Sequence, residues 1–338
     1  MENKTTIHDI ARALKIDAST VSRALNNSPR VSQKTKEKIL AKANELGYQR
    51  NLLASNLRKS KTNTIGVIVP RISRHFFSSV ISGIEEAAYD EGYNVIICQS
   101  LEQLKRENDI VGTLLANRVA GILLSVSMET KNLDHLLNIK NNGIPFLFFD
   151  RHCEIDGISS VLIDDVQGGF DATEHLILNG CKNIGHFSGP QELAIYRNRK
   201  AGYIKALQKH NIPFRPEQVL CSSLMETDGA EGAKTLLSLP NKIDGLFSAN
   251  DIAAIGAMKY FKNEGVRIPE DIGIVGFSNE PISGAIDPSL TTIDQPGFEI
   301  GQISTKLLLQ EINDSSGLKK AKITILKSSL IERDSSRK

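Results

Sequence analysis

The feature that most constrains the fold is an alternation, from Thr64 to Gly276, of short apolar runs with longer segments of helical periodicity. The first run, residues 65–69, has the length of a buried strand, and residues 77–91 after it have the pattern of a helix that ends at Gly92. Strands that alternate with helices are typical of a parallel sheet with helices on both faces. The alternation therefore predicts an α/β fold.

The alternation falls into two series, which predicts two doubly wound lobes. The first continues with strands at 94–98, 121–124 and 145–149 and helices at about 103–117 and 131–142. The second restarts at 160–163, with further strands at 184–187, 219–221, 243–247 and 272–276 and helices at about 168–179, 196–210, 228–238 and 251–263.

A different pattern precedes the lobes, in residues 6–26. Thr6 and Asp9 have the spacing of a capping box, and apolar residues then recur on one helical face at Ile7, Ile10, Ala11 and Leu14. After a break, Asp17 can cap a second helix with Val21, Ala24 and Leu25 inside, which leaves Ala18, Ser19, Ser22, Arg23 and Asn26 outside. A third helix is expected at 32–46, capped by Ser32, stopped by Gly47, with Ile39, Leu40, Ala43 and Leu46 inside. Two short helices joined by a tight turn favour a helix-turn-helix that enters the major groove of DNA.

The charge distribution supports this interpretation. Residues 1–61 hold 13 Lys and Arg against 5 Asp and Glu, whereas residues 62–338 hold 28 against 34. The balances are therefore +8 and −6, which the overall +2 conceals. A basic head on an acidic body is expected of a protein whose head binds phosphates.

Composition narrows the remaining choices. A chain of 338 residues with 40% apolar content is long enough for two or three globular units. It contains no apolar run near 18 residues and no apolar signal segment in MENKTTIHDI, so we expect a cytoplasmic protein without a membrane span. The four cysteines are widely separated and form no CxxC, which predicts buried free thiols and no metal site.

The segment TIHDIARALKIDASTVSRALNNSPRVSQKTKEKILAKANELGYQRN resembles the DNA-binding head of the LacI/GalR family of bacterial transcription regulators. The runs STVSRALN, RVS and LGY carry the resemblance. It implies that Ala18, Ser19 and Arg23 read bases, that Thr20, Ser22 and Asn26 lie near the backbone, and that Thr6 and Arg30 belong to the same DNA-binding set. Arg23 is the best base reader, because Arg can donate two bonds to guanine.

Residues 52–63, LLASNLRKSKTN, allow two interpretations. Leu53, Ala54 and Leu57 fall on one helical face, yet two turns of helix are marginal alone, so a charged linker is equally consistent. The resemblance implies a hinge helix in which Ala54 and Leu57 contact the minor groove, Leu57 as a wedge that bends the duplex. Arg50 stands where the family usually has Pro.

The resemblance also implies a core of periplasmic-binding-protein type, in which 296–312 is a helix of the first lobe and 322–332 a strand of the second. We therefore expect a head at 1–50, a hinge at 51–62, a first lobe at 63–161 and 294–320, and a second at 162–293 and 321–334. The tail DSSRK has the composition of an unstructured end.

Ligands of such folds lie at the carboxyl ends of the strands, here between the lobes. Phe76, Phe77, Ser125, Asp150, Asn250 and Ser278 follow predicted strands, although each residue could instead pack or cap a helix. The resemblance adds Arg197, Arg199, Leu224 and Gln295 to this effector set.

Two residues differ from the pattern of the family. Most members have Asp at Ser278, and many have an aromatic residue at Leu224. Without that carboxylate the pocket is expected to be more positive, which predicts an anionic effector, a sugar acid or sugar phosphate, bound by Arg199 and Arg74. Pairing of Arg197 with surface carboxylates is an equally good interpretation of that residue.

Catalysis is not supported, because the chain contains no GxGxxG after the first strand, no GxxxxGK[ST], no HExxH and no GxSxG. We predict no catalytic residue, cofactor or metal. The expected protein is a homodimeric regulator, most often a repressor in this family, which binds double-stranded operator DNA and a small carbohydrate effector. The alternative is a sugar-binding receptor without a DNA role.

Overall fold

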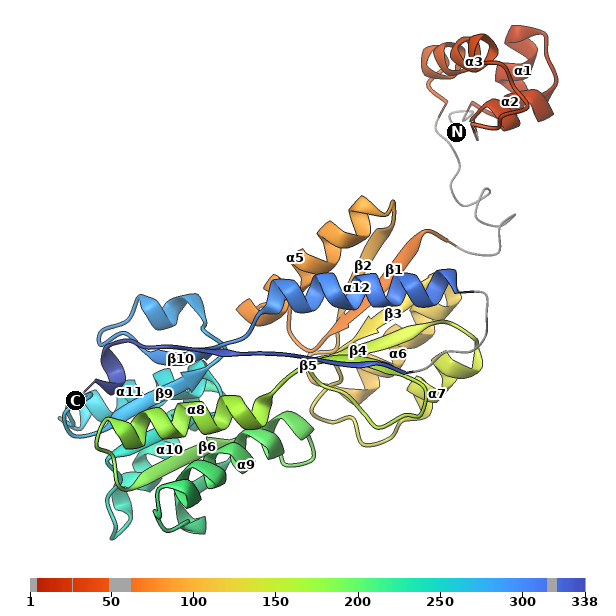
Figure 1. Cartoon of the computed structure of the whole chain (residues 1–338). Helices are drawn as coiled ribbons and strands as arrows, with labels where there is room; N and C mark the ends of the chain where they lie inside the picture. Colours follow the sequence, from red (N-terminus) through yellow and green to blue (C-terminus); the bar gives the residue numbers. More distant parts are fainter. Residues whose placement is uncertain (1–4, 26, 49–61, 315–320, 338) are drawn as a thin grey trace. The chain divides into compact units, whose positions relative to one another are not determined.

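The computed structural model describes residues 5–25, 27–48, 62–314 and 321–337. The chain divides into two compact units, Met1–Lys61 and Thr62–Lys338. Each unit has its own apolar core, and each is described by itself below (Figure 1).

The first unit is a three-helix head built from α1 (Ile7–Leu14), α2 (Ala18–Leu25) and α3 (Gln33–Glu45), as predicted. The Asp9 carboxylate accepts bonds from the Thr6 backbone N–H (2.9 Å) and hydroxyl (2.6 Å), which fixes the start of α1. The Ser32 hydroxyl accepts from the Thr35 N–H and starts α3. Gly47 has a φ of +62°, the left-handed conformation that ends a helix at little cost for glycine.

The core of the head is small and contains Ile10, Val21 and Ile39, all fully buried. One sequence prediction is wrong here: the side chain of Leu40 is 48% exposed. Leu40 follows Ile39 on α3, and adjacent helical positions point about 100° apart, so both cannot face a core this narrow.

The second unit contains two sheets. The first has the strand order β11-β5-β4-β3-β1-β2, and all its pairs are parallel. Its strands are β1 (Thr64–Val69), β2 (Asn94–Gln99), β3 (Gly121–Leu124), β4 (Phe146–Phe149), β5 (Ser159–Ile163) and β11 (Ile323–Leu326). Its helices are α5 (His75–Asp90), α6 (Leu104–Ala116), α7 (Asp134–Asn141) and α12 (Gly297–Asn313). Helix α5 packs against α12 and α6 against α7.

The second sheet has the order β12-β10-β9-β8-β6-β7, parallel except for β12, which runs antiparallel to β10. Its strands are β6 (Ile184–Ser188), β7 (Val219–Cys221), β8 (Gly245–Ser248), β9 (Gly273–Phe277), β10 (Thr291–Asp294) and β12 (Ser329–Ile331). Its helices are α8 (Asp165–Leu178), α9 (Ala194–Lys209), α10 (Glu226–Ser238) and α11 (Asp251–Asn263), with short 3-10 turns at Pro216–Gln218, Pro281–Gly284 and Asp334–Ser336. Two α/β lobes are therefore present, as predicted.

The division between the lobes differs from the expected one. Strand β5 was expected to open the second lobe, but it pairs with β4 in the first sheet, Phe149 opposite Val161. The expected strand at 322–332 is two strands, because β11 pairs with β5 in the first sheet and only β12 belongs to the second. The chain thus passes between the lobes after β5, before α12 and between β11 and β12 (Figure 1).

The C-terminal segment also differs from expectation. Ser335 and Ser336 are fully buried, and the Ser335 hydroxyl donates to the Ile274 carbonyl oxygen at 2.6 Å. The Ser336 hydroxyl is 2.7 Å from that of Thr291. The prediction of an unstructured tail is therefore wrong: two small hydroxyl groups fill the edge of the second sheet.

Three pairs of packed helices meet at glycines. At the crossing of α8 and α9, a Cβ on Gly169 would lie 2.2 Å from the Arg199 carbonyl oxygen, and one on Gly202 would lie 2.1 Å from that of Val166. The same mutual contact occurs between α5 and α12 at Gly83 and Gly301, and between α10 and α11 at Gly229 and Gly256. The absent side chains let the helix backbones touch, which sets the position of α9 and its polar residues.

The cysteines within the described residues are all free, but only Cys181 is buried, so the expectation of buried thiols holds for one of four. No helix in the described ranges is both long and apolar enough to cross a membrane.

Candidate functional site

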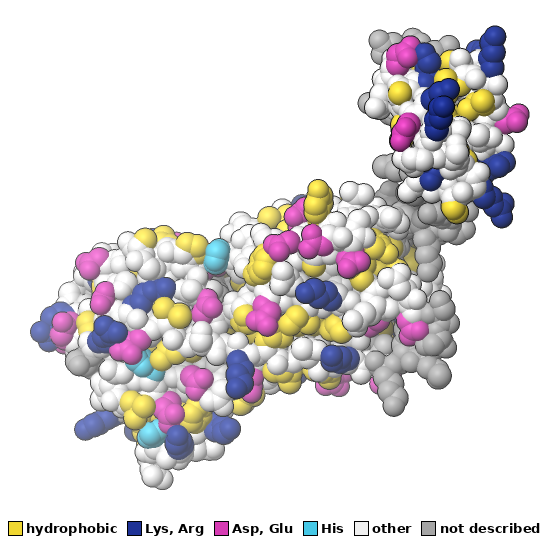
Figure 2. All heavy atoms as spheres, turned by 45° about the horizontal axis from the view of Figure 1, so that its top comes forward, with side chains coloured by type: hydrophobic (Ala, Val, Ile, Leu, Met, Phe, Trp, Pro, Cys, Tyr) yellow, Lys and Arg dark blue, Asp and Glu magenta, His cyan; other side chains and the backbone are white. Residues whose placement is uncertain are grey.

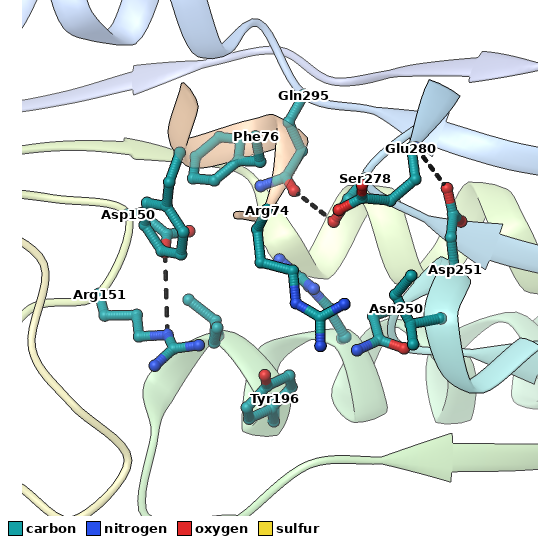
Figure 3. Close-up of a pocket in the computed structure, with 14 residues that line it drawn as sticks. Arg74, Phe76, Asp150, Arg151, Tyr196, Asn250, Asp251, Ser278, Glu280 and Gln295 are labelled. Atoms are coloured by element: carbon teal, nitrogen blue, oxygen red, sulfur yellow. Dashed lines mark hydrogen bonds and ion pairs between the residues drawn. The ribbon is translucent and has the colours of Figure 1, made fainter. Parts of the chain in front are cut away.

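A pocket of about 510 Å³, counting the part that is open to solvent, lies where the carboxyl ends of both sheets meet (Figure 3). Its walls come from the segments that follow β1, β4, β8, β9 and β10, together with the first turns of α9. The lining residues are Arg74, Phe76, Phe77, Asp150, Arg151, Ile195, Tyr196, Arg199, Asn250, Asp251, Ile252, Ser278, Glu280 and Gln295. A site at the carboxyl ends of parallel strands is the expected place for a ligand in such folds.

Arg199 projects from α9 and is 97% buried, with a relative exposure of 3%. Its Nε donates to the Asp165 carboxylate at 2.8 Å, and its Nη1 donates to the Ala249 carbonyl oxygen at 2.8 Å. The guanidinium carbon lies 3.6 Å from the centre of the Phe277 ring. These contacts fix the side chain and offset the loss of water around its charge. Burial raises the pKa of Asp165 to about 6, although Arg199 acts in the opposite direction.

Arg151 and Asp150 form a second buried group, at the end of β4. The Arg151 Nη1 donates to the Glu102 carboxylate at 2.8 Å, and its Nε lies 3.8 Å from the Asp150 carboxylate. The Ser125 hydroxyl donates to the same Asp150 oxygen at 3.4 Å. Burial raises the pKa of Asp150, while Arg151 and Arg199 lower it.

The remaining polar wall belongs to the second lobe. The Asn250 side chain accepts from the Ala253 N–H at 2.8 Å, which caps α11, and donates to the Leu224 carbonyl oxygen at 2.9 Å. The Ser278 hydroxyl donates to the Gln295 Oε1 at 2.8 Å. Asp251 is fully buried and accepts from the hydroxyls of Thr292 and Ser283 and from the Glu280 N–H, but burial still raises its pKa to about 6.

The structure brings most of the predicted effector residues together. Eight of them line the pocket: Arg74, Phe76, Phe77, Asp150, Arg199, Asn250, Ser278 and Gln295. Ser125 contacts the pocket only through Asp150. Two residues lie outside its lining: Leu224 is fully buried, and Arg197 is exposed and donates to the carbonyl oxygens of Gln191 and Glu192.

Several lining residues were missed by the sequence analysis: Arg151, Ile195, Tyr196, Asp251, Ile252 and Glu280. A local signal exists for three of them. Arg151 and Asp251 directly follow the predicted residues Asp150 and Asn250, and Tyr196 lies three positions before Arg199, on the same face of a helix.

The lining of the pocket shows no excess of basic side chains. The lining contains three arginines and three carboxylates. Glu102 and Asp165 add two carboxylates, which are bonded to Arg151 and Arg199. The lining and its bonded partners therefore hold three arginines and five carboxyl groups, so the absence of Asp at Ser278 does not leave an excess of basic side chains.

In the head, the outer face of α2 presents the residues predicted to meet DNA. Ser19 and Arg23 are exposed, and the Arg23 Nη2 donates to the Ser19 hydroxyl at 3.1 Å. Ala18, Thr20 and Ser22 are half-buried, while Thr6 and Arg30 are exposed. Asn26, Ala54, Leu57 and all but the last residue of the expected hinge at 51–62 lie outside the described residues. Lys and Arg side chains are prominent on the visible face of the head (Figure 2).

Comparison with known families decides between the two expected kinds of protein. Residues 6–51 match the family described as bacterial regulatory proteins, lacI family, and residues 62–333 match the periplasmic binding proteins and sugar binding domain of the LacI family. The chain belongs to the LacI family. A LacI-family member carries a helix-turn-helix head for DNA, so the alternative of a receptor without a DNA role is not supported.

Individual relatives agree with this assignment. The chain is 33% identical to the HTH-type transcriptional repressor CytR of Escherichia coli, over 92% of the chain and 91% of CytR. Among solved structures it resembles the lac repressor dimer bound to operator and the anti-inducer ONPF, with 27% identity, a TM-score of 0.85 and 99% coverage of both chains. It also resembles a LacI-family regulator from Enterococcus faecium with bound ribose, with 30% identity, a TM-score of 0.71 and coverage of 81% of this chain and 98% of that one.

These findings confirm the predicted fold class. They also confirm that the protein is a helix-turn-helix repressor with a sugar-binding domain of periplasmic-binding-protein type, and not an enzyme.

Proposed function

We propose that this LacI-family repressor binds a near-palindromic operator as a homodimer, and that a carbohydrate bound between its lobes controls operator binding. The observation that carries the effector class is the composition of the pocket wall. The aromatic rings of Phe76 and Tyr196 line the same pocket as the polar side chains of Asp150, Arg199 and Asn250. Rings can cover the C–H face of a sugar, while carboxylates, amides and guanidinium groups bond its hydroxyls.

The effector would bridge the lobes, because the walls of the pocket come from both lobes. Phe76 and Asp150 belong to the first lobe, and Arg199 and Asn250 belong to the second. A sugar that bonds both lobes favours the arrangement in which these groups lie close together. A ligand shifts such an equilibrium only by its unequal affinity for the two states, and a ratio of about a hundredfold, about 2.7 kcal/mol, gives useful switching.

On the DNA side, Arg23 is the proposed base reader, supported by Ser19. The bond from Arg23 to the Ser19 hydroxyl orients the guanidinium on the exposed face of α2. Ala18 offers only a methyl contact to thymine, and Thr6, Thr20, Ser22, Asn26 and Arg30 are proposed to contact the backbone. The roles of Ala54 and Leu57 as minor-groove contacts of a hinge helix rest on the resemblance alone.

Dimer formation is proposed from the relatives, since the lac repressor structure that this chain resembles is a dimer on its operator. Two copies of the head would then occupy two half-sites about one helical turn or a small multiple apart.

A calorimetric screen tests the proposed effector. The full chain is titrated with a panel of neutral sugars, sugar acids and sugar phosphates. We expect at least one neutral sugar to bind at one site per chain and to raise the midpoint of thermal unfolding, because it binds only the folded state. If no carbohydrate of the panel binds while a compound of another class does, the proposed effector class is wrong.

A further inference from the structure

The N-terminus of α5 faces the pocket. Arg74 precedes the helix as its N-cap residue, and Phe76 and Phe77, in its first turn, line the pocket. The helix has 16 residues, so its first N–H groups carry the partial positive charge of a long helix dipole. Such an N-terminus favours an anionic group of a ligand.

Two side chains add donors to the same pocket. The Gln295 side chain is buried, with a relative exposure of 8%. Its Nε2 nevertheless has no hydrogen-bond partner among the described residues. In Figure 3 its amide group points into the pocket between Phe76 and Ser278. In Figure 3 the Arg74 side chain extends into the pocket toward Asn250; it forms no ion pair within the described ranges, and its Nη2 contacts the Met225 Sδ at 3.6 Å. Helix, amide and guanidinium together would suit a phosphate or carboxylate.

A carboxylate of the protein itself already lies at the N-terminus of this helix. The Glu280 Oε2 accepts from the backbone N–H of His75, the first residue of α5, at 3.4 Å. Glu280 comes from the other lobe, and its own backbone is held in place because its N–H donates to the Asp251 carboxylate at 2.7 Å. The glutamate thus reaches across the cleft to the N-terminus of α5, which would attract an anion.

We propose that Glu280 is a specificity residue that excludes anionic effectors and restricts the pocket to uncharged sugars. An incoming phosphate or carboxylate would have to displace the Glu280 carboxylate or lie beside it, where like charges repel. The other groups do not compensate, because without Glu280 the pocket and its bonded partners still hold four carboxyl groups against three arginines. This inference rests on the proposed carbohydrate effector and corrects the expectation of an anionic one.

The test is to remove the negative charge without changing the shape of the side chain. Glu280→Gln in the full chain is titrated with inorganic phosphate and, separately, with glucose 6-phosphate, and the rise in the unfolding midpoint gives the affinity. We expect the affinity for phosphate to increase at least about tenfold over the wild type, since one like charge at short range is removed. Glu280→Ala serves as the second variant, because it removes the carboxylate as well.

Two further variants serve as controls. Glu192→Gln is the matched control: Glu192 also pairs across the lobes, with Lys131 at 3.6 Å, but lies outside the pocket lining, so its variant should bind phosphate like the wild type. In the double variant Glu280→Gln with Arg74→Gln, we expect the increase in phosphate affinity to be lost. This result would show that the phosphate binds in the pocket. Any phosphate that binds to the basic head contributes equally to every variant, so it does not affect the differences in affinity between them.

Equal phosphate affinity of the wild type and both Glu280 variants would overturn the inference, and so would tight phosphate binding by the wild type. Neither result affects the proposed function, which the calorimetric screen with neutral sugars tests independently.

Discussion

Gly169→Ala is the substitution whose effect the structure specifies most closely. The added Cβ would lie 2.2 Å from the carbonyl oxygen of Arg199, whereas ordinary contacts begin at 3.4 Å. Helices α8 and α9 must therefore separate by about 1.2 Å at their crossing, and the obstacle is backbone, which cannot rotate away as a side chain can.

The expected cost follows from overpacking. Inserting a methyl group into a closed contact typically costs about 1–3 kcal/mol, and we expect the upper part of this range because both sides are backbone. Alanine recovers up to about 1 kcal/mol through its better helix propensity, which leaves a net loss of about 2 kcal/mol. The displaced residue is Arg199, so Gly169→Ala should also weaken sugar binding.

Gly112→Ala is the matched control. Gly112 lies in α6, is exposed, and would place no atom within 4 Å of an added Cβ. This variant should gain up to about 1 kcal/mol. Guanidinium unfolding monitored by circular dichroism gives both free energies from the midpoint and slope. If Gly169→Ala were as stable as Gly112→Ala, the close crossing of α8 and α9 would be incorrect.

Three further predictions concern single residues. The pKa of Asp251 is about 6 in the folded state and 3.8 in the unfolded state, so the folded state binds more protons between these pH values. The contribution of Asp251 to the free energy of unfolding therefore falls by about 3 kcal/mol as the pH rises from about 4 to 6. Asp251→Asn should flatten this part of the curve in urea unfolding at a series of pH values; an unchanged slope would contradict the assignment. Arg199→Lys keeps the positive charge beside Asp165 but loses the planar guanidinium with its two hydrogen bonds, so it should weaken sugar binding at least about tenfold in calorimetry. Arg197→Lys, two residues away and outside the pocket lining, should leave sugar binding unchanged. Arg23→Ala should cost about 1–3 kcal/mol of operator affinity and relax sequence preference, which competition with scrambled duplexes would reveal.

The sequence predicted the secondary structure well, because each element carries its own periodicity. The assignment of strands to sheets was less accurate. Residues 159–163 and 323–326 are apolar runs that fit either lobe. Pairing with β4 places the first run in the first sheet, and pairing with β5, from far along the chain, places the second run there too. Strand β10 was missed because Thr291 and Thr292 are polar, although both are fully buried.

The site was predictable where it depends on topology and unpredictable where it depends on distant partners. Residues at the strand ends, such as Asp150, Asn250 and Ser278, line the pocket because parallel strands end at one edge. The charge of the pocket could not be inferred, since Arg199 is bonded to a carboxylate 34 residues earlier and Arg151 to one 49 residues earlier.

The measurement that tests the account most directly is a titration of a labelled palindromic operator with the full chain, at fixed salt, with and without a saturating neutral sugar. We expect the sugar to change the operator affinity at least about tenfold, and operator DNA to change the sugar affinity by the same factor, because coupling between two sites is reciprocal. Superimposable operator curves, with the sugar bound in the pocket by calorimetry, would contradict the claim that the effector controls DNA binding.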